Sequence, residues 1–168
     1  ILQPRKGFWD STFVSNPSVC VEEHGEIHMI HKSKREEHPK LILGLAVATD
    51  PEGPYIRKGP SPIFEYDVED PFIWKEDGLY RMLAKDMSGE LVGRFNGVLF
   101  QSTDGLHWNP SDPPLAYDHN ILWADGHVDR YPFVERPQLL LEEGKPVCLY
   151  NAIGDAKSYS FNLARRIK

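Results

Sequence analysis

The chain has 168 residues, of which 40% are hydrophobic, 26% charged and 11% aromatic, a composition typical of a folded domain and not of a disordered or fibrous chain. Asp and Glu outnumber Lys and Arg by 25 to 19, and a net charge of −6 argues against a nucleic-acid-binding surface, because phosphate contacts need clustered basic residues. No stretch approaches the roughly 18 consecutive apolar residues of a membrane-spanning helix, so we expect no membrane segment. The first residue is Ile1 and not Met, which indicates a trimmed or processed chain.

Short apolar runs, separated by Gly and Pro, follow one another along the whole chain. The sequence contains 13 Gly and 14 Pro, and no segment of ten or more residues shows a helical period. This pattern predicts an all-β protein. The predicted strands cover, in chain order, residues 18–21, 27–30, 41–48, 72–74, 79–84, 98–101, 139–141, 147–150 and 160–164.

Two polar segments are predicted to lie between strands. The basic cluster 32–35 is followed directly by Glu36 and Glu37, so we interpret it as a solvated turn and not as an anion site. Residues 110–134 are rich in Asp, Pro, Tyr and Trp, which predicts a long linker. Such a linker either covers a site or only connects neighbouring units.

The cysteines and histidines do not form a recognisable metal motif. Cys20 and Cys148 are 128 residues apart without a CxxC pair, so we predict two buried free thiols, with a disulfide as the alternative. His24, His28 and His31 are interpreted as surface histidines, because residues 28 and 31 of one strand point to opposite faces. We therefore expect neither a metal site nor a cofactor.

Three segments of the chain repeat one order of Pro, apolar strand, Gly turn and further strands. They begin at Asn16-Pro17, Asp70-Pro71 and Arg136-Pro137, and the prolines lie 54 and 66 residues apart. A period near 50 with about four strands is typical of β-propeller blades, whereas a generic β-sandwich would not explain the repeated order.

The repeat predicts a single domain, residues 1–168, that is a partial β-propeller. We expect about three antiparallel blades of the four-stranded kind, the third ending after its third strand. Their approximate limits are 14–60, 68–115 and 134–168.

The first strand of every propeller blade lines the central channel, so the residues before each repeated Pro should gather near the axis. These residues are Asn16, Asp70 and Arg136, preceded by Ser15, Glu69 and Glu135. Carboxyl groups brought together from two repeats are typical of enzymes that cleave glycosidic bonds. A turn or a structural ion pair is the alternative for each motif taken alone.

The motifs at 16–19, 69–74 and 135–139 resemble blade segments of five-bladed β-propeller glycoside hydrolases of the family 43 type, which include arabinanases, β-xylosidases and arabinofuranosidases. The resemblance implies blades two to four, with Glu135 as general acid and Asp70 as the residue that modulates its pKa. It also implies that the general base falls outside these blades, so that the chain alone would be a poor or inactive hydrolase. Invertases and mannoside phosphorylases share the Asp-Pro motif, so these families remain alternatives.

Four further side chains complete the predicted site. Trp9 and Phe72 could stack on a sugar ring, with buried packing as the alternative, and Lys85 and Asn151 follow second strands, where they could reach a sugar hydroxyl. Together with Asn16, Glu69 and Arg136 they form the predicted substrate-binding set. The predicted partner is a carbohydrate, either an oligosaccharide or a glycoside, and self-association could complete the propeller. The alternative function is a non-catalytic carbohydrate-binding or inactive propeller fragment.

Overall fold

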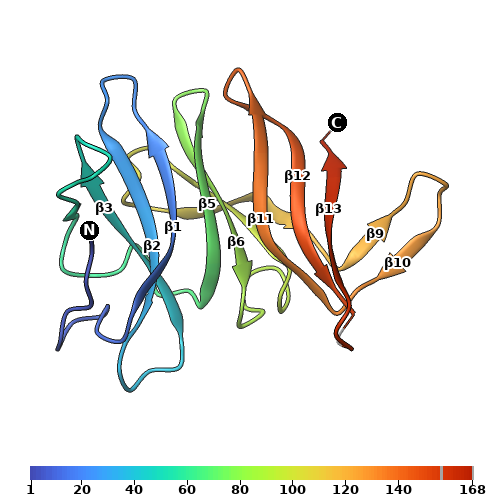
Figure 1. Cartoon of the computed structure of the whole chain (residues 1–168), viewed down its shortest axis with the longest axis horizontal. Coiled ribbons are helices and arrows are strands. Elements are labelled where there is room, and N and C mark those ends of the chain that lie inside the picture. The colour runs from blue at the N-terminus through green and yellow to red at the C-terminus, as the bar shows by residue number, and fades with distance from the viewer. Residues whose placement is uncertain (156, 168) are drawn as a thin grey trace.

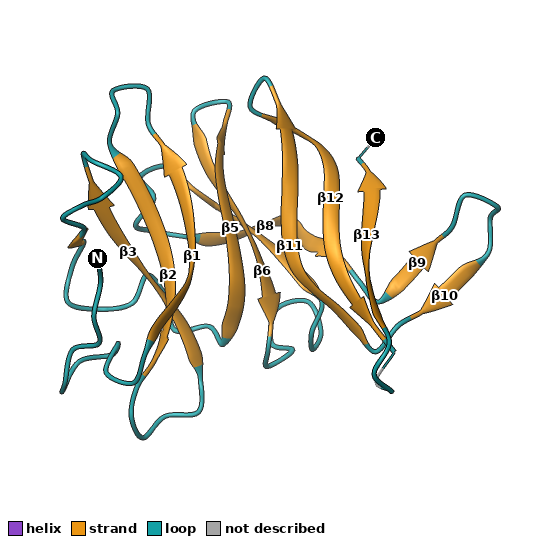
Figure 2. Ribbon diagram, in the orientation of Figure 1, coloured by secondary structure: helices purple, strands orange, loops and turns teal. Residues whose placement is uncertain are grey.

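The computed structural model describes residues 1–155 and 157–167, and within these ranges the chain contains strands, turns and bends but no helix. None of the described residues therefore belongs to an apolar helix long enough to cross a membrane. Three antiparallel sheets stand side by side, and a small hairpin projects beyond the third (Figures 1 and 2). The predicted unit 134–168 ends at Lys168, which lies outside the described residues.

Within each sheet the strands are adjacent in chain order. The first sheet contains β1 (Val14–Val21), β2 (Ile27–Lys34), β3 (Leu41–Ala48) and β4 (Ile56–Arg57). The second contains β5 (Val68–Glu76), β6 (Leu79–Asp86), β7 (Gly97–Ser102) and β8 (Asn109–Tyr117). The third contains β11 (Phe133–Glu142), β12 (Lys145–Gly154) and β13 (Ser160–Arg166), and the hairpin pairs β9 (Asn120–Leu122) with β10 (Val128–Arg130). Such antiparallel meanders are the blades of a β-propeller.

Tight turns at Gly78 and Gly144 join the first two strands of the second and third sheets. In the second sheet Glu76 pairs with Leu79 across the two-residue turn Asp77-Gly78, whose φ angles are 50° and 79°. The turn Glu143-Gly144 has φ angles of 51° and 79°. Two successive positive φ angles define the turn whose twist matches that of paired antiparallel strands, which explains why the repeat carries Gly at this point.

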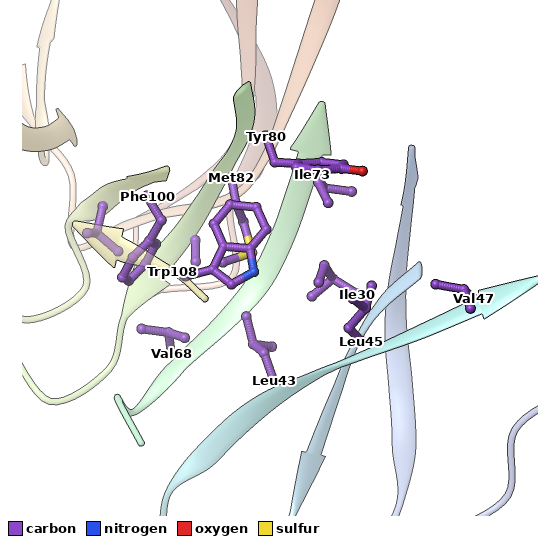
Figure 3. Packing of buried hydrophobic residues seen from close by; sticks show 12 residues of the cluster. Ile30, Leu43, Leu45, Val47, Val68, Ile73, Tyr80, Met82, Phe100 and Trp108 are labelled. Carbon is purple, nitrogen blue, oxygen red and sulfur yellow. The ribbon is translucent and has the colours of Figure 1, made fainter. Parts of the chain in front are cut away.

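Buried side chains hold neighbouring sheets together. Figure 3 shows the cluster between the first and second sheets, where aliphatic residues of β2 and β3 meet residues of β5, β6 and β7 and the indole of Trp108. A second cluster joins the second and third sheets, with Trp74, Leu83, Val134, Leu149 and Ile153 among its members. Both clusters lie between the faces of adjacent sheets, as in propeller blades.

The innermost strands of the three sheets are β1, β5 and β11. The central one, β5, contacts both β1 and β11, and Figure 1 shows the three running alongside one another. All three enter from the same end of the molecule, so the residues near their starts are brought to one region.

Two segments predicted to lie between strands contain residues that belong to strands. Residues 110–134 contain most of β8 and the whole β9–β10 hairpin, so they are not simply a linker. The prolines of β8 are tolerated because this strand pairs only with β7 and forms an edge of its sheet. Residues 32–34 are the end of β2 and not a solvated turn, which begins only at Arg35.

Candidate functional site

A bulge with a left-handed residue interrupts each inner strand at the repeated proline motif. The register shifts between Ser15 and Ser18 in β1, between Glu69 and Phe72 in β5 and between Glu135 and Gln138 in β11. The φ angles of the residues before the prolines are 48° for Asn16, 53° for Asp70 and 53° for Arg136.

These backbone angles are unusual for the residues that adopt them. Asn and Asp tolerate the left-handed region, but Arg does so only with strain, and a residue before proline normally prefers extended backbone. The strain is therefore greatest at Arg136, and strained backbone of this kind is often found at functional sites.

The three bulges form one cavity of about 190 Å³. The residues that line it are Asn16, Pro17, Asp70, Pro71, Arg136 and Gln138. The side-chain amide Nδ2 of Asn16 donates a hydrogen bond to Oδ1 of Asp70, linking the first sheet to the second. The structure thus brings together the three residues that precede the repeated prolines.

A chain of four charged side chains runs beside this cavity and crosses all three sheets. Lys32 Nζ of β2 lies 3.0 Å from Oε2 of Glu69, and Lys85 Nζ of β6 lies 2.6 Å from Oε1 of the same carboxylate. Lys85 Nζ also lies 2.7 Å from Oε1 of Glu135 in β11. Lys85 is almost fully buried, Glu69 is 15% exposed and Glu135 is 31% exposed. Of the two carboxylates among these four side chains, Glu135 is therefore the more open to a ligand.

For Glu69 and Lys85, charge pairing has a larger effect on the pKa than burial has. Burial by itself would raise the pKa of Glu69, but hydrogen bonds from the ammonium groups of Lys85 and Lys32 hold that pKa below its ordinary value. Burial would lower the pKa of Lys85, but its hydrogen bonds to Glu135 and Glu69 raise it. Lys85 therefore stays charged and Glu69 stays ionised at neutral pH.

A second layer of side chains supports Glu135. Nδ2 of Asn151 in β12 donates to the backbone carbonyl of Glu135 at 3.3 Å, and Arg165 Nη2 of β13 donates to Oδ1 of Asn151 at 2.6 Å. The Arg165 guanidinium lies 5.6 Å from the ring centroid of Tyr117. Burial, together with the Asp70 carboxylate nearby, raises the pKa of the Tyr117 hydroxyl.

The predicted residues Trp9 and Phe72 lie outside this arrangement. The Trp9 indole is 6% exposed, stacks on His31 with ring centroids 5.5 Å apart and does not line the cavity. Phe72 follows the bulge of β5 and packs near Trp74 in the cluster between the second and third sheets. Lys85 and Asn151 lie inside β6 and β12, near their ends, and not beyond them.

Lys32 and Tyr117 were not among the predicted site residues. A signal for Lys32 existed in the repeat, since Lys32 pairs with Ser15 in the first sheet just as Lys85 pairs with Glu69 in the second. Tyr117 had no such signal, because it ends a strand that the sequence pattern did not predict.

Two of the three histidines interpreted as surface residues are buried. His31 is fully buried, and His28 is 6% exposed and stacks on Tyr80. Burial, with a further contribution from the Arg57 charge, lowers the pKa of His31 to about 4. Among the described residues no three His, Cys, Asp or Glu side chains are placed to hold a metal ion. Cys20 and Cys148 are free thiols, and both are half-buried where full burial was expected.

Comparison with known proteins supports the assignment of the fold. No family model matches the chain. A β-xylosidase from Xylanibacter ruminicola is 25% identical over 154 residues, which cover 84% of this chain and 41% of that protein. The chain therefore spans less than half the length of this curated relative.

Solved structures of carbohydrate-active enzymes share the architecture. Fructan 1-exohydrolase IIa from Cichorium intybus aligns with a TM-score of 0.63 and 18% identity, over 98% of this chain and 32% of that one. An α-L-arabinofuranosidase from Podospora anserina aligns with a TM-score of 0.57 and 10% identity, over 98% of this chain and 50% of that one. The chain thus has the all-β, propeller-type fold of these glycoside hydrolases.

Proposed function

We propose that this chain belongs to a glycosidase whose propeller channel binds a carbohydrate, with Glu135 as general acid and Asp70 as the residue that modulates it. The observation that carries the proposal is the convergence of three equivalent bulges on one cavity, with Asp70 in its wall and Glu135 directly before Arg136. The similarity to a β-xylosidase and to the propeller enzymes above supports a glycosidic bond as the target.

The proposed chemistry places a proton on the oxygen of the leaving group. Glycosidic bonds break through a transition state in which that oxygen gains negative charge, so a carboxylic acid within hydrogen-bonding reach accelerates the reaction. Glu135 is partly exposed and next to the cavity, whereas Glu69 is bound by two lysines and offers little surface.

A general acid must reach the leaving oxygen, and Glu135 Oε1 is held 2.7 Å from Lys85 Nζ. Lys85 has a second partner, because its Nζ also lies 2.6 Å from Glu69. A substrate can therefore separate Glu135 from Lys85 without leaving a buried ammonium unpaired. In this proposal the binding of sugar both positions the glycosidic oxygen and frees Glu135 to contact that oxygen.

Hydrolysis also needs a base that activates water. Asn16 occupies the position in β1 that corresponds to Asp70, and an amide cannot act as a base. The proposal therefore assigns this role to a carboxylate of another segment or another molecule.

The acid role is tested by the dependence of rate on the leaving group. We expect Glu135→Gln to lower kcat/KM by about 100-fold or more on glycosides with poor leaving groups such as methoxide, because general acid catalysis contributes about 10² to 10⁴ in rate. On 2,4-dinitrophenyl glycosides, whose leaving group needs no proton, the loss should be less than about tenfold. Asp70→Asn should shift the alkaline limb of the pH–rate profile, because the general acid is active only in its protonated form.

The matched control is Glu142→Gln, an exposed Glu at the other end of β11. The measurement uses any active form of the protein. Equal activity of Glu135→Gln and Glu142→Gln on all substrates, or sugar binding by calorimetry with no turnover, contradicts the catalytic assignment.

A further inference from the structure

A second cleft, which the proposed chemistry does not use, has the ring of Phe95 in its wall, and Lys85 lies near that ring. The volume of the cleft is about 440 Å³. One wall comes from the loop between β6 and β7, and the other comes from the end of β10 and the segments that flank the β9–β10 hairpin. The lining residues are Arg94, Phe95, His119, Arg130, Tyr131 and Pro132.

Lys85 connects this cleft to the candidate acid. Its Nζ lies 5.7 Å from the ring centroid of Phe95 and 2.7 Å from Oε1 of Glu135. Lys85 therefore lies between a ring that lines the cleft and the carboxyl group that is proposed to protonate the leaving oxygen.

The two arginines of the cleft carry charges that no carboxylate of the described residues neutralises within salt-bridge distance. The Arg94 guanidinium lies over the Phe95 ring, 4.6 Å from its centroid, and Arg130 Nη1 donates to Oδ1 of Asn120 at 3.4 Å. The nearby carboxylate of Asp129 accepts hydrogen bonds from the Trp123 indole at 3.0 Å and contacts the His127 ring at 3.2 Å. In a chain with a net charge of −6, this cleft offers two positive groups to a ligand.

His119 adds a buried polar atom without a partner. The side chain is 5% exposed, and Nδ1 lies 2.7 Å from the backbone carbonyl of Tyr131, so Nδ1 carries the hydrogen that is donated. In the neutral ring Nε2 then holds a lone pair, and it is buried without a hydrogen-bond partner among the described residues. Buried polar atoms are rarely left unpaired, and a ligand hydroxyl at this wall would supply the missing partner.

We propose that this cleft binds the carboxylate of a uronic acid, so that the substrate carries an acidic sugar next to the bond that is cleaved. Guanidinium groups bind carboxylates through paired hydrogen bonds, aromatic rings provide an apolar surface for the sugar, and His119 can accept a hydrogen bond from a hydroxyl. This inference rests on the proposed function, because it assumes that the sugar extends into the cleft from the site at Glu135.

Binding of free sugars tests the inference without requiring turnover. D-Glucuronate and D-galacturonate are titrated into the protein and followed by NMR, with D-glucose and D-galactose as neutral counterparts. We expect at least one uronate to bind about tenfold or more tightly than its neutral counterpart. Arg94→Gln and Arg130→Gln should each weaken uronate binding about tenfold and leave the neutral sugars unchanged, because charge-assisted hydrogen bonds are the stronger kind.

The control variant is Arg35→Gln, an exposed arginine that pairs with Glu65 away from the cleft, and it should bind uronates like the wild type. Uronates that bind no better than neutral sugars, or cleft variants that behave like Arg35→Gln, overturn the inference. Inorganic phosphate that binds at the same arginines as tightly as either uronate also overturns it, since the cleft would then select a free anion. Glu135→Gln should retain uronate binding whatever its activity, so a failed catalytic assignment is distinguishable from a failed carboxylate site.

Discussion

Arg136 shows the cost of holding a site residue in left-handed backbone. Its φ of 53° is unfavourable for a side chain with a Cβ, whereas Gly adopts this angle freely. We expect Arg136→Gly to raise the free energy of unfolding by about 1 kcal/mol in urea denaturation, since relief of strain outweighs the added freedom of the unfolded chain. The same variant should bind sugars more weakly, because a cavity side chain is lost.

Glu143→Gly provides the matched comparison, because Glu143 has a φ of 51° in a turn that does not line the cavity. It should gain similar stability and keep the sugar affinity of the wild type. If both glycine variants bind sugar equally well, Arg136 is held in strained backbone for some reason other than binding.

Lys85 joins the carboxylates of Glu69, which also pairs with Lys32, and of Glu135. Removal of one member of a buried charge pair is strongly destabilising because the remaining charge is left uncompensated. We expect Lys85→Met to lower the free energy of unfolding by about 3 kcal/mol, measured by chemical denaturation at pH 7. Lys58→Met, a change at an exposed lysine, should have little effect, and Glu69→Gln combined with Lys85→Met should recover part of the loss.

The pH dependence of stability follows from Glu69. Its pKa in the folded chain lies below the ordinary value of 4.5, so the contribution of its ionised form is complete above pH 4.5 and is lost as the pH falls through the folded value. In Glu69→Gln the free energy of unfolding should therefore decrease less steeply than in the wild type as the pH falls below 4.5. Parallel curves for the two proteins would show that the ion pair with Lys85 does not contribute to acid stability.

At the level of elements, the apolar runs predicted a part of each of nine strands, but the first strand of each sheet extends further towards its start than predicted. Proline was treated as the boundary, whereas β1, β5 and β11 continue through Pro17, Pro71 and Pro137 by means of a bulge. The four missed strands are short or carry several prolines, as β8 does, and pair at sheet edges or in the small hairpin. Hydrophobic periodicity carries no signal for such strands, because they bury few side chains.

The pairing of β7 with β8 depends on Gly97, which lies opposite Tyr117. A Cβ at residue 97 would lie 2.1 Å from Cε1 of the Tyr117 ring, closer than packed atoms allow. We expect Gly97→Ala to lower the melting temperature, with a loss of about 1–3 kcal/mol from overpacking. The loss should vanish when Tyr117→Ala removes the ring.

Gly154→Ala serves as the control for Gly97→Ala. Its Cβ would meet Phe133 at 3.4 Å, an ordinary contact, and its φ is not in the left-handed region. A Gly97→Ala variant as stable as Gly154→Ala would contradict the proposed packing of Tyr117 against this strand.

At the scale of the whole molecule, the repeat in the sequence indicated which residues meet near the axis but not which side chains pair between sheets. Lys32 and Glu69 belong to different sheets, as do Lys85 and Glu135, and their separations of 37 and 50 residues follow from how the sheets stack. A period in the sequence fixes equivalent positions within each blade. The contacts between blades depend on how neighbouring sheets are staggered, and this stagger leaves no period in the sequence. The sequence therefore gives no sign that Lys32 pairs with Glu69.

The third sheet presents apolar side chains on the face turned away from the second. Phe133 is 40% exposed, Leu140 46% and Tyr150 40%, and all three belong to β11 or β12. The pairing of β11 with β12 places these three side chains on one face of the third sheet. The residues that pack against the second sheet lie on the other face. Exposed apolar surface of this kind is typical of interfaces, and β13 also leaves a strand edge unpaired among the described residues.

We therefore expect the chain to self-associate through this face of the third sheet. Sedimentation equilibrium should give a mass above that of the single 19.2 kDa chain at micromolar concentration. Leu140→Lys together with Tyr150→Lys should restore the monomer, because buried charges at an apolar interface are strongly unfavourable. The matched pair Lys6→Ala and Lys58→Ala, at exposed positions elsewhere, should leave the mass unchanged. A wild-type chain that sediments as a monomer at every concentration tested would show that this face does not bind a second copy.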